Sequence, residues 1–66
     1  MSIGQIIKDL RQEKGISQAL LAKTIGVSQK AIDYWERDIN QPKASYIVAM
    51  ADFFDVSCDY LLGRQK

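Results

Sequence analysis

The stretch that decides the fold runs from Ser17 to Trp35 and reads SQALLAKTIGVSQKAIDYW. Its apolar residues repeat with helical spacing on both sides of Gly26, which predicts two short helices joined by one tight turn. These residues are Leu21, Ala22 and Ile25 before the glycine and Val27, Ala31, Ile32 and Trp35 after it. Ala22 is small where two crossing helices come close, and Gly26 stands where the chain needs a left-handed residue. The pattern is that of a helix-turn-helix, here over residues 17–37.

Polar residues lie on the outer side of the second helix of this pair. Ser28 is its expected N-cap, because a serine oxygen accepts hydrogen bonds from the free N–H groups of a first turn. The residues expected to face outward are Gln29, Lys30, Asp33, Tyr34 and Arg37. Gln pairs with adenine, Lys reaches guanine or phosphate, and Tyr contacts a thymine methyl. Such residues occur on any solvated helix, but at this place in the motif they indicate the reading of DNA bases.

A first helix is expected from about Ser2 to Glu13, ending at Gly15, because four apolar residues repeat at helical spacing. They are Ile3, Ile6, Ile7 and Leu10. Ser17 then caps the second helix. Turn residues follow at 38–42, where Pro42 moves Gln41 out of helical geometry.

A fourth helix is expected from about Ala44 to Phe54, and a short fifth helix begins after the cap Ser57 and ends at Gly63. The fourth would bury Ile47, Val48, Ala51 and Phe54, and the fifth carries Tyr60, Leu61 and Leu62. No segment has the two-residue period of a strand. The predicted fold is all-α, a compact five-helix bundle forming one domain over residues 1–66. Its expected core is Leu10, Leu21, Ala22, Ile25, Val27, Ile32, Trp35, Ile47, Ala51 and Leu61.

Length and composition indicate a small cytoplasmic domain. A chain of 66 residues buries about 60% of its unfolded surface, so its stability is marginal and a partner subunit would add to it. No apolar run approaches 18 residues, and residues 1–15 mix charges among apolar residues, unlike a signal peptide. We therefore expect no membrane partner. The single cysteine, Cys58, permits no internal disulfide, which fits a reducing compartment.

The charge distribution is more informative than the net charge of +1, which by itself is weak support for a nucleic-acid partner. Residues 1–43 hold seven Lys or Arg against five acids. Residues 44–62 hold Asp52, Asp55 and Asp59 and no base. A basic end and an acidic end would orient the domain toward phosphate.

Residue sets that support catalysis are missing from the sequence. No histidine is present to activate a Ser or Cys, and no Gly-rich phosphate loop precedes a helix. The three acids of residues 44–62 are better interpreted as a solvated face than as a metal or acid-base cluster. We expect a binding module with no enzyme activity, no cofactor and no metal.

From about Ile6 to Leu62 the chain resembles the DNA-binding domain of the lambdoid phage repressor and Cro type, the XRE family of bacterial and phage regulators. The residues that carry the match are LRQEKGISQ (Leu10 to Gln18), LAKTIGVSQKAIDYWER (Leu21 to Arg37), the Gln41-Pro42 loop, and MADFFDVSCDYLLG (Met50 to Gly63). Several spaced motifs over nearly the whole chain are far more specific than one. The resemblance implies sequence-specific binding of double-stranded DNA by a transcriptional regulator, with a repressor as first choice.

The resemblance also implies roles for single residues. Base edges or nearby backbone would be touched by Ser28, Gln29, Lys30 and Tyr34. The sugar-phosphate chain would be met by Gln18, Arg11, Arg37, Asn40 and Lys43. Arg11 and Glu36 would form an ion pair that links the first helix to the third. Three residues depart from the family pattern, since Leu20 replaces a polar residue, Lys43 replaces a capping serine, and Tyr34 is bulkier than many reading residues.

A homodimer is expected, because one recognition helix covers few base pairs and two of them, about 34 Å apart, would read an inverted repeat. By resemblance the interface would lie at Ala44, Tyr46, Cys58 and Tyr60. With no second domain, no small-molecule effector is evident.

Two other interpretations stay open: an antitoxin-like protein-interaction module on the same scaffold, and the N-terminal domain of a longer regulator. Loss of DNA binding with retention of a tight protein complex would select the first of these.

Overall fold

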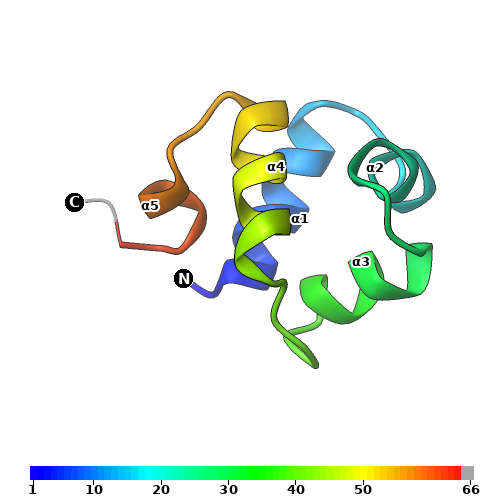
Figure 1. The fold of residues 1–66 in the computed structure, drawn as a ribbon, viewed down its shortest axis with the longest axis horizontal. Helices are drawn as coiled ribbons and strands as arrows, with labels where there is room; N and C mark the ends of the chain where they lie inside the picture. Colours follow the sequence, from blue (N-terminus) through cyan, green and yellow to red (C-terminus); the bar gives the residue numbers. More distant parts are fainter. Residues whose placement is uncertain (65–66) are drawn as a thin grey trace.

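The computed structural model describes residues 1–64, which form five α-helices and no strand (Figure 1). The helices are α1 (Ile3–Glu13), α2 (Gln18–Ile25), α3 (Gln29–Glu36), α4 (Ala44–Phe54) and α5 (Cys58–Leu61). In Figure 1 the α2–α3 pair lies on one side of α4, and α5 lies on the other. Contacts join α3 to α1 and α2, and α5 to α1 and α4. The expected all-α fold is confirmed for these residues, and the last two residues of the expected domain 1–66 lie outside them.

Serine side chains cap the start of four helices. The Oγ atoms accept hydrogen bonds of 3.0–3.1 Å from backbone N–H groups three residues further on. The capping residues are Ser2, Ser17, Ser28 and Ser57. Helix α4 differs, because Lys43 stands at its N-cap position and makes no side-chain cap hydrogen bond. The expected caps at Ser17, Ser28 and Ser57 are confirmed, and α1 begins one residue later than expected because Ser2 is extended.

The turn between α2 and α3 is made by Gly26, whose φ of 89° lies in the left-handed region. The N–H groups of Gly26 and Val27 both donate to the carbonyl oxygen of Ala22, at 2.8 and 2.9 Å. These bonds satisfy the carbonyl of Ala22 in the last turn of α2, and the left-handed Gly26 ends the helix. The predicted helix-turn-helix is confirmed.

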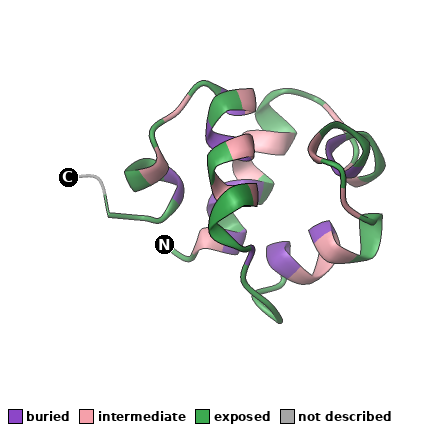
Figure 2. Cartoon of the chain, in the orientation of Figure 1, coloured by how far each residue is buried: buried purple, intermediate pink, exposed green. Residues whose placement is uncertain are grey.

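Within the described part of the chain, the core is formed by ten buried apolar residues from all five helices (Figure 2). They are Ile6, Ile7, Leu21, Ala22, Ile32, Trp35, Met50, Ala51, Phe54 and Leu61. Six of the ten residues expected in the core are among them. The other four, Leu10, Ile25, Val27 and Ile47, are half-buried and pack against it.

The prediction that Val48 is buried is wrong. Val48 is 51% exposed, and Met50 is fully buried instead. Helix α4 is apolar on most of its surface, so its sequence does not define which face points inward. The observed buried stripe runs through Ile47, Met50, Ala51 and Phe54, which follow the spacing i, i+3, i+4 and i+7.

A close approach at Gly4 connects the start of α1 to the end of α3. The N–H of Gly4 donates to Asp38 Oδ1 at 3.2 Å, and Asp38 itself has a left-handed φ of 58°. A Cβ atom at Gly4 would overlap the carbonyl oxygen of Trp35 and lie 2.6 Å from Asp38 Oδ1. The absence of a side chain at Gly4 therefore allows the end of α3 to sit against α1.

Candidate nucleic-acid interface

Helix α3 is buried on one face and open on the other. Ile32, Trp35 and Glu36 are buried against the rest of the molecule. On the opposite side Gln29, Lys30 and Arg37 are exposed, and Asp33 and Tyr34 are half-buried. The structure therefore brings the four expected base-reading residues, which include the cap Ser28, onto the first two turns of one anchored helix.

Arg11 and Glu36 form the expected ion pair between α1 and α3. Arg11 Nε lies 2.6 Å from Glu36 Oε2 and Nη2 lies 3.0 Å from Oε1, so the contact is bidentate. The two side chains are 12% and 3% exposed. Hydrogen bonding to Glu36 raises the pKa of Arg11 above its ordinary value, although partial burial opposes this. Arg11 Nη1 also donates to the carbonyl oxygen of Ile16, at 2.8 Å, next to the cap of α2.

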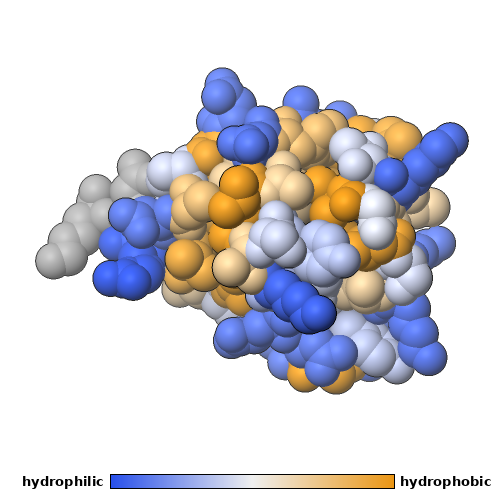
Figure 3. Space-filling view, in the orientation of Figure 1, coloured by the Kyte–Doolittle hydropathy of each residue, from blue (hydrophilic) through white to orange (hydrophobic). Residues whose placement is uncertain are grey.

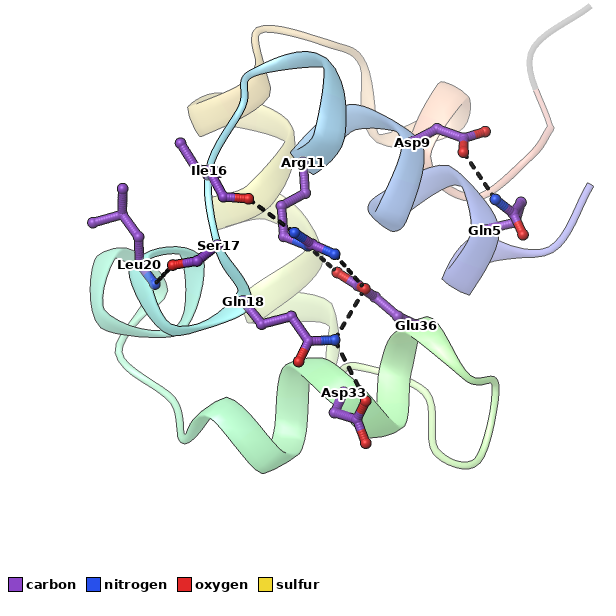
Figure 4. A network of polar contacts seen from close by, with 9 residues as sticks. All are labelled: Gln5, Asp9, Arg11, Ile16, Ser17, Gln18, Leu20, Asp33 and Glu36. Carbon is purple, nitrogen blue, oxygen red and sulfur yellow. Dashed lines mark hydrogen bonds and ion pairs between the residues drawn. The ribbon is translucent and has the colours of Figure 1, made fainter.

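Gln18, the first residue of α2, joins the same network (Figure 4). Its Nε2 donates to Glu36 Oε1 at 3.1 Å and to Asp33 Oδ1 at 3.4 Å. An amide nitrogen has two hydrogens, so both are directed at carboxylates. The start of α2 is thereby connected to α1 and to α3.

Two further pairs lie along the outer side of α3, each with i, i+4 spacing. Arg37 Nη1 donates to Asp33 Oδ2 at 3.1 Å, and the two side chains are 61% and 36% exposed. The Lys30 ammonium lies 5.5 Å from the centre of the Tyr34 ring, in cation–π contact. Four of the five residues expected to face outward are therefore paired with a neighbour on the same helix.

The remaining candidate residues lie in the loop after α3 and in the last two helices. Asn40 and Lys43 are exposed, on either side of the buried Pro42. Of the residues expected at the dimer interface, Ala44 and Tyr60 are exposed. Tyr46 is half-buried against Trp35, with ring centres 5.6 Å apart, and Cys58 is half-buried against the core.

Sequence reasoning missed the bridging contacts of Asp33 and the approach at Gly4. The i, i+4 spacing of Asp33 and Arg37 was a visible signal for their pairing. The contact between Gln18 and Asp33 had no such signal, because it depends on how α2 crosses α3.

Apolar side chains are also present on the surface. Leu20 is exposed, as its departure from the family pattern predicts, together with Ile39, Val48, Tyr60 and Leu62. On the face seen in Figure 3, apolar residues gather over the middle of the molecule and hydrophilic residues lie mainly around the edge. Within residues 1–64 no helix has the length and apolar character needed to cross a membrane.

Known proteins are similar to this chain in sequence and in fold. A family model described as helix-turn-helix matches residues 7–61. The HTH-type transcriptional regulator ImmR of Bacillus subtilis (strain 168) is 30% identical over 66 residues, which cover 100% of this chain and 52% of that protein. Repressor protein C2 of Salmonella phage P22 is 38% identical over 60 residues, which cover 91% of this chain and 28% of that protein.

A solved structure is similar over the whole domain. The crystal structure of the P22 c2 repressor protein in complex with a synthetic operator has a TM-score of 0.92 and 35% identity, covering 98% of each chain. The present chain spans about half the length of one of the two curated relatives named above and less of the other.

Proposed function

The chain belongs to the helix-turn-helix family, and from that premise we propose that it is a sequence-specific transcriptional repressor that binds double-stranded DNA. The first two turns of α3 enter the major groove, and two copies of the chain bind the two halves of an inverted repeat. The protein acts in the cytoplasm and is not an enzyme. Its similarity to one protein named as a transcriptional regulator and another named as a repressor supports both statements.

The open first turn of α3 is the observation that supports this function most. Gln29 and Lys30 are exposed there, while the opposite face of the same helix is fixed by the core and by Arg11. A helix held in this way loses little freedom on binding, so its side chains meet base edges in a defined register. Gln29 suits adenine, Lys30 suits guanine, and Tyr34 suits a thymine methyl, with Ser28 at the nearby backbone.

Phosphates are met on both sides of this reading surface. Arg37, Asn40 and Lys43 follow the end of α3 and contact one stretch of the sugar-phosphate chain. The start of α2, with Gln18, meets another phosphate through its free N–H groups. The guanidinium of Arg11 is engaged by Glu36 and Ile16, so we assign it an indirect role in which it fixes the start of α2 against α3.

The dimer forms through the start of α4 and through α5. The residues assigned to it are Ala44, Tyr46, Cys58 and Tyr60. Sedimentation at rising concentration, alone and on a palindromic duplex, tests this interface. We expect a dimer that Tyr60→Asp weakens. A strictly monomeric species with one protein per duplex would contradict the arrangement.

Selection from random duplexes of about 20 base pairs, a length that holds two half-sites one turn apart, tests the function itself. We expect the purified chain to enrich an inverted repeat. The enriched site, placed at a reporter promoter, should lower expression when the chain is present. Enrichment of no sequence would contradict DNA reading, and raised expression would contradict repression.

A further inference from the structure

The segment that carries the proposed reading surface has no excess of positive charge. Residues 28–43 contain three cations, Lys30, Arg37 and Lys43, and three acids, Asp33, Glu36 and Asp38. Surfaces that bind DNA are as a rule strongly basic, because phosphate contacts supply most of the affinity for any sequence. This segment therefore has little charge with which to hold an arbitrary duplex.

Asp33 differs from the other two acids of the segment. The Glu36 side chain is buried and paired with Arg11, and Asp38 accepts from the N–H of Gly4 at the far end of α3. The Asp33 side chain is 36% exposed and lies one turn after Gln29 and Lys30, on the outer side of α3. It is thus the carboxylate of this segment that lies among the proposed reading residues.

Asp33 also restrains two residues that we assign to phosphates. Its Oδ2 accepts from Arg37 Nη1 at 3.1 Å, and its Oδ1 accepts from Gln18 Nε2 at 3.4 Å. A carboxylate has about four acceptor positions, so two remain for a donor from outside. In the major groove the base donors are the amino groups of cytosine and adenine.

We propose that Asp33 is a specificity-determining residue of the α3 surface. Its charge, and its hold on Arg37 and Gln18, lower the affinity for every duplex. That loss of affinity is offset at a site where a cytosine or adenine amino group donates to the carboxylate. At other sites the carboxylate loses water without gaining a donor, which weakens binding. The inference rests on the proposed function, because it concerns the same helix and the same groove.

If Asp33 only stabilised the fold, removing its charge would lower the midpoint of unfolding and leave the choice between duplexes unchanged. In the Asp33–Arg37 pair the side chains are 36% and 61% exposed, and pairs in contact with solvent contribute little to folding. The contact of Asp33 with Gln18 is long, at 3.4 Å. Removing the charge should therefore leave thermal unfolding nearly unchanged and alter the choice between duplexes.

The test compares Asp33→Asn, Asp33→Glu and the matched control Asp52→Asn, which removes one charge from the last turn of α4. The probes are the duplex enriched by the wild-type chain from the random library and a scrambled duplex of the same composition. Fluorescence anisotropy gives both affinities at several salt concentrations, and circular dichroism gives the midpoint of unfolding.

We expect Asp33→Asn to bind the scrambled duplex about fivefold more tightly near 0.15 M salt, the effect of about one unit of charge. The enriched duplex should gain nothing, so the ratio of the two affinities falls by about fivefold or more. Asp33→Glu should keep the low affinity for the scrambled duplex, and Asp52→Asn should leave the ratio unchanged.

An unchanged ratio for Asp33→Asn, or equal weakening on both duplexes, would overturn the role of Asp33 while leaving the proposed function intact. A wild-type chain that prefers no duplex would overturn the proposed function, and the role of Asp33 with it.

Discussion

The half of the molecule formed by α2 and α3 combines apolar packing with directional polar contacts, whereas the half formed by α4 and α5 is held chiefly by apolar packing. In the first half Arg11, Gln18, Asp33 and Glu36 connect three helices. In the second half Met50, Ala51, Phe54 and Leu61 fill the core, and Val48, Tyr60 and Leu62 stay exposed. Directional contacts fix side chains within narrow limits, which base reading requires. Exposed apolar residues suit a contact between copies of the chain.

Breaking the polar network should have the largest effect on stability. Arg11→Met leaves the Glu36 carboxylate buried without its charged partner, so we expect the free energy of unfolding to fall by about 3–5 kcal/mol. Urea unfolding measures this loss. The double variant Arg11→Met/Glu36→Leu should recover much of it, because an apolar pair leaves no buried charge. Losses that simply add would contradict the coupling of α1 to α3.

The packing of α4 is tested by two residues that lie two positions apart. Met50→Ala removes a fully buried side chain and should lower the free energy of unfolding by about 2–5 kcal/mol. Val48→Ala shortens an exposed side chain, so it should change stability by less than about 0.5 kcal/mol. Thermal unfolding of both variants checks the observed orientation of α4. Equal losses would mean that both residues contribute to the core.

Two variants at opposite ends of α3 distinguish base reading from phosphate contact. Gln29→Ala should lose about 1–3 kcal/mol of binding on the enriched duplex and little on a scrambled one. Arg37→Ala should weaken both, with a salt dependence smaller by about one unit. Binding isotherms at several salt concentrations distinguish the two. If Gln29→Ala weakens both duplexes equally, Gln29 does not read bases.

Helix capping gives the smallest contrast between the two halves. Ser28→Ala removes the Oγ acceptor at the start of α3 and should cost about 1 kcal/mol of stability. Lys43→Ser supplies the acceptor that α4 lacks and should gain up to about 1 kcal/mol. Chemical unfolding of the two variants measures both changes. A loss of stability in Lys43→Ser would show that the lysine stabilises α4 by another contact.

Local chemistry made most helix boundaries predictable from sequence. Ser17, Ser28 and Ser57 each mark a helix start because a serine oxygen bonds the first turn, and Gly26 marks the turn because it accepts a left-handed φ. These signals lie within a few residues of the feature that they predict. The outward residues of α3 are predictable from helical spacing after the Ser28 cap. The Arg11–Glu36 pair is predictable from the family resemblance.

Features that depend on the approach of distant segments were not predictable in this way. The sequence of α4 is apolar on several sides, so it does not show that Val48 faces outward. The orientation of α4 is decided by α2 and α5, which pack against it. The contact of Gln18 with Asp33 and the clearance at Gly4 arise between segments 15 and 34 residues apart. The proposed dimer interface at Ala44, Tyr46, Cys58 and Tyr60 involves a second copy of the chain, so it rests on the family resemblance.

We propose that the open side of α3 reads DNA while α4 and α5 face a second copy of the chain. Amide chemical shifts of the labelled chain, followed as the enriched duplex is added, test it most directly. We expect the largest changes at Gln29, Lys30 and Tyr34 and at the start of α2, with smaller changes at Tyr60 as the dimer forms. Changes concentrated in α4 and α5, with α3 unaffected, would contradict the assignment of α3 as the DNA-reading helix.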